Sequence, residues 1–436
     1  MAAPERLPFA VRAGLALYGL AWRTTLHGLK RNARLREGWD ARVLASGPPP
    51  KADLWIQAAS GGEAYLAWEL LRRLPALLPG GPPPRVLATT FTSQGLGVLE
   101  RARAALDGQA ELLPAYVPFD LPGRMRRALA AVRPRAVVLL ETELWPGLLA
   151  ACREQGAPAL IVNGRMTDKS LRGYSHLPWL WRALAPARVL AVSEADARRF
   201  GRVFGAQNVG VMRNIKFDRL DFSAAPPQAE LAALLPGTAG SAPPFVVLGS
   251  VRREEEADVL RIVQGLRQRL PGAVIGLFPR HMQRVAAWRK LLEGAGAPCV
   301  LRSALDAGKA AAPGAVILWD VFGELSAAFS LADCCFLGGS LADLGGQNFL
   351  EPLGCGVTPV IGPSWSNFAW VGEEIFSAGL VRRAADWRGV LDELCALAAA
   401  PPERAAVRSA AAAYAASRRG GADAACQAVA ECLISG

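Results

Sequence analysis

The chain has 436 residues, of which 52% are hydrophobic and 20% are charged. This composition excludes a disordered protein, and at about 150 residues per domain it predicts two or three folded domains. Lysine and arginine (49) exceed aspartate and glutamate (38), giving a net charge of +11. Such an excess favours an anionic partner, which is a nucleic acid, a phosphate-bearing substrate or an acidic membrane surface. The sequence lacks a basic stripe with interleaved aromatic residues, which argues against nucleic acid.

The eight cysteines and three histidines predict neither a disulfide framework nor a metal site. No two cysteines have CxxC spacing, so we expect a reduced, cytosolic chain. His27, His176 and His281 are scattered, and no Asp-x-Asp pair is present to carry a divalent ion. We therefore predict that the protein uses no metal and no cofactor.

Residues 1–50 form a basic N-terminal segment with eight Lys/Arg and three Asp/Glu, a net charge of +5. The apolar run at 7–22 is interrupted by Arg12, and its uninterrupted part, 13–22, is well below the about 20 residues of a membrane-spanning helix. No cleavage site of a secretory signal follows closely. Two interpretations remain: a helix lying in the interface of an anionic membrane, or an amphipathic helix packed on its own domain.

From residue 54, short β-rich runs alternate with stretches of helical spacing, a pattern that predicts parallel sheets covered by helices on both faces. The predicted strands of the first series are 54–58, 85–90, 136–140, 159–163 and 188–193. Those of the second series are 245–250, 273–279, 315–319, 333–340 and 358–363, and helical sequence follows from about 384.

The stretch 223–244 is rich in Pro, Ala and Gly and is predicted to be a linker. We therefore predict an α/β protein with two doubly wound, Rossmann-like domains, 51–222 and 245–436. Facing across a cleft, two such domains would bind ligands at the carboxyl ends of their strands.

AASGGEA at 58–64 carries a candidate proton acceptor after the first predicted strand. Small residues let a ligand approach the backbone, and Glu63 then opens a helix, where its carboxylate can accept a proton from a substrate hydroxyl. The same position also suits an ordinary helix N-terminal acid, stabilised by the helix dipole.

Charged residues end other predicted strands as well. ETELWPG at 141–147 puts two acids at the end of an apolar strand, which is costly unless they are hydrogen-bonded or face a ligand. Arg280 follows a strand of the second series and is a candidate phosphate ligand. Lys216 near the domain boundary is either another phosphate ligand or a solvated lysine.

The segment FLGGSLADLGGQNFLEPLGCG at 336–356 is the best candidate for a nucleotide site. Its glycine-rich turns expose backbone N–H groups, and a helix that opens after the second turn would attract phosphate at its N-terminus. Glu351, about one turn into that helix, can bind ribose hydroxyls. The residues of this predicted site are Gly339, Ser340, Gln347, Asn348 and Glu351.

These motifs, in this order, resemble the 3-deoxy-D-manno-oct-2-ulosonic acid (Kdo) transferases of lipopolysaccharide biosynthesis. The matching segments are ASGGE, TTFTSQG, VPFD, ETELWPG, NGRMTDKS, NIKFD, PRHMQR, FGELS, GGS, GGQN, FLEP and IGP. The resemblance implies a GT-B glycosyltransferase fold, CMP-Kdo as donor substrate and a lipid A precursor as acceptor. It also implies inverting, metal-independent transfer at the cytoplasmic face of the bacterial inner membrane, whose anionic surface would be a partner.

The resemblance assigns roles by position. Glu63 would be the general base, Arg280 and the backbone at Gly339–Ser340 would receive the CMP phosphate, and Glu351 would hold the ribose. Lys216 and Asn348 would line the same donor site. The chain departs from the family's usual pattern at three places. Gln347 replaces the histidine of the usual GGHN. Residues 249–253 stand where the family usually has a Ser-Thr-His segment, and SGGE stands where it usually has SVGE.

Two other functions fit this architecture. A sugar-nucleotide epimerase or hydrolase needs no membrane surface, so the apolar and basic N-terminus argues against it. A non-catalytic protein that binds lipid or nucleotide is less favoured, because Glu63, Arg280 and Glu351 are all present.

Overall fold

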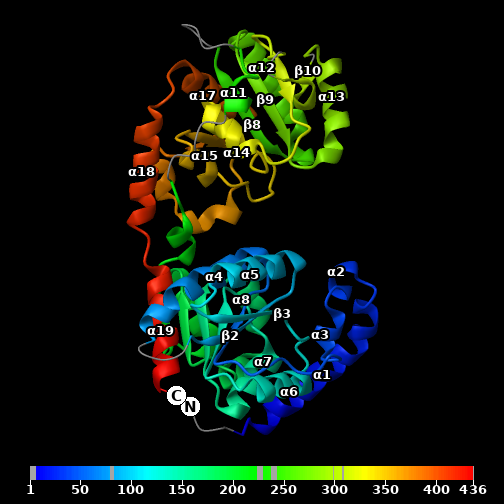
Figure 1. Cartoon of the computed structure of the whole chain (residues 1–436), viewed down its shortest axis with the longest axis vertical. Helices are drawn as coiled ribbons and strands as arrows, with labels where there is room; N and C mark the ends of the chain where they lie inside the picture. The colour runs from blue at the N-terminus through cyan, green and yellow to red at the C-terminus, as the bar shows by residue number, and fades with distance from the viewer. Residues whose placement is uncertain are drawn as a thin grey trace. The chain divides into compact units, whose positions relative to one another are not determined.

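The computed structural model describes residues 6–78, 83–222, 229–236, 243–297, 299–306 and 309–435. The chain divides into two compact units (Figure 1). The first unit comprises Met1–Arg219 together with Arg418–Gly436, and the second is Leu220–Ser417. Each unit is built on one seven-stranded sheet whose ladders are all parallel, as the alternating pattern predicts.

The sheet of the first unit has the strand order β3-β2-β1-β4-β5-β6-β7. Its strands are β1 (Leu54–Gln57), β2 (Arg85–Thr90), β3 (Glu111–Tyr116), β4 (Ala136–Leu140), β5 (Ala159–Gly164), β6 (Arg188–Ala191) and β7 (Val209–Val211). Side chains of one strand alternate between the two faces, and both faces are buried. In β4, for example, Val137 and Leu139 enter one core cluster while Val138 and Leu140 enter the other.

The helices of the first unit cover both faces of this sheet. α1, α6, α7, α9 and α10 contribute to one core cluster, and α4, α5 and α19 to the other. The helices are α1 (Phe9–Leu29), α2 (Ala33–Arg36), α3 (Trp39–Val43), α4 (Gly61–Arg73), η1 (Leu74–Leu77), α5 (Ser93–Ala105), α6 (Pro122–Val132), α7 (Pro146–Gln155), α8 (Asp168–Tyr174), α9 (Pro178–Ala183), α10 (Glu194–Phe204), η2 (Ile215–Arg219) and α19 (Gly421–Ser435).

The sheet of the second unit has the order β10-β11-β9-β8-β12-β13-β14. Its strands are β8 (Phe245–Val251), β9 (Val274–Pro279), β10 (Cys299–Leu301), β11 (Val316–Leu318), β12 (Cys334–Leu337), β13 (Pro359–Ile361) and β14 (Arg382–Arg383). The helices are α11 (Ala229–Ala232), η3 (Arg253–Glu255), α12 (Glu256–Arg269), η4 (Met282–Arg284), α13 (Val285–Gly294), η5 (Arg302–Ala304), α14 (Leu325–Leu331), α15 (Leu350–Gly354), η6 (Ser366–Val371), α16 (Glu374–Ser377), α17 (Trp387–Ala399) and α18 (Arg404–Ala416). α12, α13 and α17 cover one face of the sheet, and α14, α15 and α18 contribute to the core on the other.

The N-terminal helix α1 is part of the first unit rather than a separate segment, which corrects the predicted division at residue 50. Val11 and Leu15 are buried in the core of the unit, and the Tyr18 hydroxyl donates to the buried Asp120 carboxylate at 3.0 Å. The opposite side of α1 stays exposed, with Phe9 77%, Leu17 69% and Leu20 58% exposed. The helix therefore packs on its own domain and still presents an apolar face to solvent.

The C-terminal boundary also differs from the prediction. We expected 245–436 to form one domain, but α19 packs against α4, β4 and β5 of the first unit (Figure 1). Apolar positions of this helix, among them Ala425, Cys426 and Val429, complete a core cluster of that unit. Of the predicted linker at 223–244, residues 223–228 and 237–242 lie outside the described part, and the short helix α11 lies between them.

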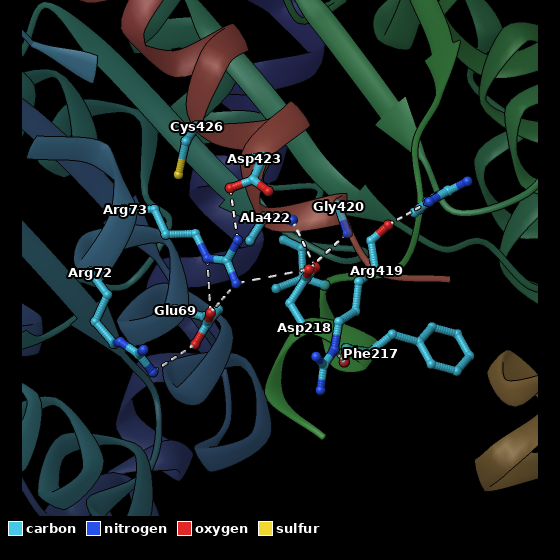
Figure 2. Close-up of polar contacts among 12 residues, drawn as sticks. Glu69, Arg72, Arg73, Phe217, Asp218, Arg419, Gly420, Ala422, Asp423 and Cys426 are labelled. Atoms are coloured by element: carbon cyan, nitrogen blue, oxygen red, sulfur yellow. Dashed lines mark hydrogen bonds and ion pairs between the residues drawn. The ribbon is translucent and has the colours of Figure 1, made fainter. Parts of the chain in front are cut away.

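A buried carboxylate anchors α19 to the segment that leads out of the first unit. Asp218 accepts hydrogen bonds from the backbone N–H groups of Gly420 at 2.8 Å and Ala422 at 2.9 Å, and so caps the N-terminus of α19 (Figure 2). Arg73 of α4 lies 3.9 Å from Asp218 and also pairs with Glu69 and Asp423. Three segments that are remote in sequence thus meet at one polar cluster.

Candidate functional site

In the first unit, the carboxyl ends of β1 and β4 mark the point where the strand order reverses. β1 lies between β2 and β4, so the chain leaves the two central strands toward opposite faces of the sheet. In doubly wound sheets such a point forms a crevice outside the strand ends, where ligands bind. Glu63 follows β1, while Glu141 and Glu143 follow β4. The structure therefore brings the predicted base and both acids of ETELWPG to one edge.

Glu63 is the third residue of α4 and is held by the turn that precedes the helix. Ser60 is the N-cap, and its hydroxyl accepts from the Glu63 N–H at 3.4 Å. The Glu63 carboxylate in turn accepts from the Ala59 N–H at 2.7 Å and the Ser60 hydroxyl at 3.1 Å. This arrangement is a variant of a capping box. It fixes the carboxylate while leaving the side chain partly accessible, so the structural and the chemical interpretation of Glu63 are compatible.

The neighbouring acids are constrained as well. Glu141 has a left-handed backbone conformation (φ 56°), which costs free energy for a residue with a Cβ and is found at functional sites. Its carboxylate pairs with the Lys216 ammonium at 2.7 Å. Glu143 accepts from the Trp145 indole N–H at 2.6 Å. The predicted donor ligand Lys216 thus lies on η2 in the first unit, in the same cluster as the predicted base.

The cluster raises the pKa of Glu63 to about 8. Burial is the largest cause, and the negative charges of Glu143 and Glu141 add to it, whereas the hydrogen bonds from Ala59 and Ser60 act in the opposite direction. Burial also raises the pKa of Glu143. A carboxyl group with a pKa near neutrality is suited to accept a proton from a hydroxyl during a reaction.

In the second unit the corresponding strand ends, those of β8 and β12, contain a carboxylate that sequence reasoning missed. Glu255 is 2% exposed, and its carboxylate accepts from the N–H groups of Arg252 at 2.8 Å, Gly339 at 2.6 Å and Leu341 at 3.3 Å. Burial raises its pKa, while these N–H groups act to lower it. The acidic run in 252–258 gave no sign of this role, because it also fits the first turn of a helix.

This arrangement engages backbone and side-chain groups of Gly339 and Ser340 within the protein. We expected their backbone to receive the donor phosphate, but Glu255 already takes the Gly339 and Leu341 amides. The Ser340 hydroxyl donates to the Leu337 carbonyl at 2.6 Å and accepts from the Gly362 N–H at 2.9 Å, and the residue is fully buried. Both residues therefore build the turn after β12, and their role in binding the donor phosphate stays a prediction.

The N–H groups of the second glycine turn also donate hydrogen bonds within the protein. The Gly346 N–H donates to the Gly339 carbonyl at 2.7 Å, and the Gly345 N–H to the Ser364 hydroxyl at 2.9 Å. The helix predicted to open after this turn is α15, which begins only at Leu350 and has five residues. It is too short to form a phosphate site, and Glu351 is its second residue rather than one turn in.

Three predicted donor residues nevertheless keep accessible side chains on this unit. Gln347 is partly exposed, and its amide lies beside Gly339, where a Cβ would approach Nε2 to 3.2 Å. Asn348 is exposed and accepts from the Leu350 N–H at 3.2 Å. Glu351 is partly buried, which raises its pKa.

Arg280 is a predicted site residue whose positive charge is exposed. It directly follows β9, its side chain is exposed, and within the described part of the chain its guanidinium has no ion-pair partner. Its backbone N–H donates to the Val251 carbonyl at 2.8 Å, which fixes it beside the end of β8. Ser250, near the end of β8, has φ 55° and is another strained position at a strand end.

Two parallel doubly wound sheets, each with polar residues at its switch point, make up the two-domain GT-B fold. Solved structures with this fold include a glycosyltransferase from Rickettsia africae (TM-score 0.57, 10% identity, 88% of this chain and 99% of that chain). They also include the UDP-GlcNAc 2-epimerase from Neisseria meningitidis bound to UDP-GlcNAc (TM-score 0.51, 12% identity, 88% and 100%). These likenesses establish the fold alone, since both a transferase and an epimerase share it.

Sequence comparison distinguishes between a transferase and an epimerase. Residues 34–219 match the family model of the 3-deoxy-D-manno-octulosonic-acid transferases. The chain is 35% identical over 409 residues to the 3-deoxy-D-manno-octulosonic acid transferase of Bordetella pertussis, covering 90% of this chain and 92% of the relative. It is 28% identical to that of Haemophilus influenzae, covering 82% and 79%. The chain belongs to the 3-deoxy-D-manno-octulosonic acid (Kdo) transferase family.

Proposed function

We propose that this protein transfers Kdo from CMP-Kdo to a lipid A precursor in lipopolysaccharide biosynthesis, with inversion at the anomeric carbon and without a metal ion. The observation that carries the proposal is the position of Glu63 at the end of β1, with its pKa raised to about 8 beside Glu143 and Glu141. Membership of the Kdo transferase family supports the chemistry of the transferred sugar.

The proposed reaction is a single displacement. The Glu63 carboxylate accepts the proton of an acceptor sugar hydroxyl, and the hydroxyl oxygen forms a bond to the anomeric carbon of Kdo. The bond from that carbon to the phosphate oxygen breaks, and CMP leaves with the electron pair. A positive charge beside the leaving phosphate, supplied by Arg280, stabilises the developing negative charge.

The direct test is to incubate the purified protein with CMP-Kdo and a tetraacyl lipid A precursor and to measure the lipid by mass spectrometry. We expect the lipid to gain the mass of one or more Kdo residues, with an anomeric configuration opposite to that in the donor and with no loss of rate in excess chelator. Release of CMP at the same rate without lipid, and no mass gain with lipid, would instead support the epimerase or hydrolase alternative.

Replacing Arg280 by glutamine tests the donor role of the second unit. Loss of a charge-assisted contact to phosphate should weaken CMP binding by roughly 10- to 100-fold. Calorimetric titration with CMP measures this effect without any need for turnover. Arg289→Gln on α13 is the matched control, because that exposed arginine pairs only with Glu293 of its own helix among the described residues. Equal CMP affinity in the Arg280 variant and the wild type would refute the assignment.

The exposed side of α1 supports the proposal that the protein binds the anionic inner-membrane surface. The apolar side chains of Phe9, Leu17 and Leu20 lie on a helix whose sequence also carries exposed Arg12 and Arg23. The neighbouring helix α9 adds Trp179, 43% exposed, which packs closely over Gly14: a Cβ there would lie 2.8 Å from its ring. Apolar and aromatic residues beside arginines are typical of surfaces that lie in a membrane interface.

None of the described helices is long and apolar enough to cross a membrane. The double substitution Leu17→Glu and Leu20→Glu should therefore weaken binding to vesicles that contain anionic lipid, because it removes apolar contacts and adds repulsion. Sedimentation with vesicles measures the bound fraction, which should fall at least about tenfold. Leu291→Glu, at a 38% exposed leucine of α13, controls for an added charge. Unchanged sedimentation of the double variant would contradict a membrane role for α1.

A further inference from the structure

Three fully buried polar side chains are joined by hydrogen bonds at the carboxyl ends of β1 and β2. Trp55 and Gln57 lie on β1, and Thr89 lies opposite Gln57 on β2. The Trp55 indole N–H donates to the Thr89 hydroxyl at 2.7 Å, and that hydroxyl donates to the Gln57 amide oxygen at 2.5 Å. The reaction proposed above makes no use of these side chains. We call these three residues the Gln57 network.

The direction of the hydrogen bonds fixes which way the Gln57 amide faces. An indole N–H can only donate, so the Thr89 oxygen accepts from Trp55 and keeps its own proton for the Gln57 oxygen. The Gln57 NH₂ group must therefore point away from Thr89. Of the residues that the structure describes, none accepts from this NH₂ group with normal hydrogen-bond geometry. A fully buried donor of this kind requires a partner.

The Glu143 carboxylate is the acceptor beside this amide. Burial raises the pKa of Glu143, whereas hydrogen bonding with the Trp145 indole and the interaction with the Gln57 side chain lower it. The indole N–H donates at 2.6 Å. Hydrogen bonds among catalytic groups are often long and shorten only during the reaction. The Glu143 carboxylate is therefore held between an indole of its own turn and an amide of β1.

The indole on one side of Glu143 is itself fixed. The Trp145 ring stacks on the Phe91 ring, with centroids 5.1 Å apart and an interplanar angle of 22°. The Phe91 carbonyl accepts from the fully buried Arg42 guanidinium at 2.6 Å. The contact with Trp145 therefore varies little, and Gln57 determines what the carboxylate meets on its other side.

Ionisable groups from several elements surround Glu143. The charge of Glu141, in the same turn, adds to the rise in its pKa, and Lys216 of η2 pairs with Glu141 at 2.7 Å. Burial and then the Glu143 charge raise the pKa of Tyr174 on α8. On α4, burial raises the pKa of Glu63 most, and Glu143 adds more to this rise than Glu141 does. Glu143 is thus the carboxylate neighbour with the larger effect on the proposed base.

We propose that Gln57, oriented by Thr89 and Trp55, is a positioning residue that keeps the Glu143 carboxylate ionised beside Glu63. The Gln57 network thereby sets the proton affinity of the base from a fully buried position. Without it, Glu143 would keep its proton to higher pH, and its charge would no longer oppose deprotonation of Glu63. This inference rests on the proposed function, because Glu63 is the base of that reaction.

Thr89→Val removes the hydroxyl that orients Gln57 and keeps the shape of the side chain. In the pH profile of kcat/KM for Kdo transfer, the midpoint should fall by about 0.5–1 unit. The variant should be faster than the wild type at about pH 6.5, where more of the base is deprotonated, and slower at about pH 9, where the base is weaker. Thr89→Ser, which keeps the hydroxyl, should restore the wild-type profile. A rate that drops at every pH without a change in midpoint would overturn the inference.

Thr90→Val is the matched control, with the same substitution at the next residue of β2. Thr90 is equally buried, points to the opposite face of the sheet, and its hydroxyl has no hydrogen-bond partner in the described ranges. Its midpoint should equal that of the wild type, and a shift as large as in Thr89→Val would contradict the proposed role. Gln57→Leu provides a second variant if Thr89→Val does not fold. It should also lower the midpoint, and an unchanged midpoint would refute the inference.

Combination with Glu143→Gln tests the route through Glu143. That variant has already lost the charge that the Gln57 network stabilises, so adding Thr89→Val or Gln57→Leu should shift the midpoint no further. Independent shifts that add together would show that the network acts on Glu63 by another route, and the inference would be wrong.

A titration without turnover separates this inference from the proposed function. The protein is labelled with ¹³C at the glutamate carboxyl carbons, and the Glu63 and Glu143 signals are assigned by their loss in Glu63→Gln and Glu143→Gln. Thr89→Val should raise the pKa of Glu143 and lower that of Glu63. An unchanged pKa of Glu143 would overturn the inference. A wild type that transfers no Kdo, while Thr89→Val changes both pKa values in this way, would contradict the proposed function alone.

Discussion

Glu63→Gln should reduce Kdo transfer by about 10²- to 10⁴-fold, the usual contribution of a general base. Glutamine retains the shape of the side chain, and its carbonyl oxygen can accept one of the two hydrogen bonds that hold Glu63, from the Ala59 N–H or the Ser60 hydroxyl. It cannot take up a proton. The loss should therefore appear in kcat, while CMP affinity stays close to that of the wild type, because the predicted donor residues of the second unit are untouched.

The same residue sets the expected dependence on pH. A base acts only when deprotonated, and the pKa of Glu63 is raised to about 8, so kcat/KM should rise with pH and level off above about 8. Glu143→Gln removes a neighbouring negative charge, which should move this midpoint to lower pH. Initial rates measured from about pH 5.5 to about pH 9.5 cover both sides of that pKa and report the shift of the midpoint. Near-normal transfer by Glu63→Gln, or a rate that falls as pH rises from 6 to 8, would refute the base assignment.

Asp218→Ala should destabilise the first unit by about 2–4 kcal/mol. The substitution removes the cap from the N-terminus of α19 and leaves the N–H groups of Gly420 and Ala422 without their acceptor. It also takes away one of the carboxylates near Arg73. Because the Asp218 side chain is only 1% exposed, water cannot readily replace these contacts. Hydrogen exchange of the α19 amides should accelerate by a factor that matches the loss of stability.

Asp423→Ala is the matched control. Asp423 pairs with the same arginine at 2.7 Å, but its side chain is 68% exposed. Exposed ion pairs contribute about 0–1 kcal/mol, so this variant should change exchange in α19 very little. Asp218→Asn, which keeps one acceptor oxygen, should lie between the two. Equal effects of Asp218→Ala and Asp423→Ala would contradict the capping role.

The central strands of both sheets were predictable, whereas the strands at the edges were not. All ten predicted strands are present, and the four that were missed, β3, β7, β10 and β14, are the outermost strands of the two sheets. A central strand such as β4 is buried along its whole length and reads as the apolar run AVVLL. β14 consists of two exposed arginines, and β3 contains a proline. Strands buried on one side only carry a weak apolar signal.

The residues of the candidate site show the same division between local and distant causes. The position of Glu63 was predictable, because the strand, the capping serine and the helix that place it are contiguous in sequence. The partner of Gly339 was not, because Glu255 reaches that turn from 84 residues away. Likewise, no local pattern reveals that Arg219 stacks on Tyr65, since η2 and α4 meet only in the folded chain.

The return of α19 to the first unit has a consequence for biosynthesis. Residues 1–219 emerge from the ribosome first, but the part of their core that packs against α19, over α4, β4 and β5, stays uncovered until Gly421–Ser435 have been made. At about 5–20 residues per second, the intervening chain takes roughly 10–40 s to synthesise. During this interval the nascent first unit exposes apolar surface to chaperones, whereas the continuous segment 220–417 can fold as soon as it has been made. Premature stop codons near residue 420 would thus damage the unit that was translated earliest and spare the one translated last.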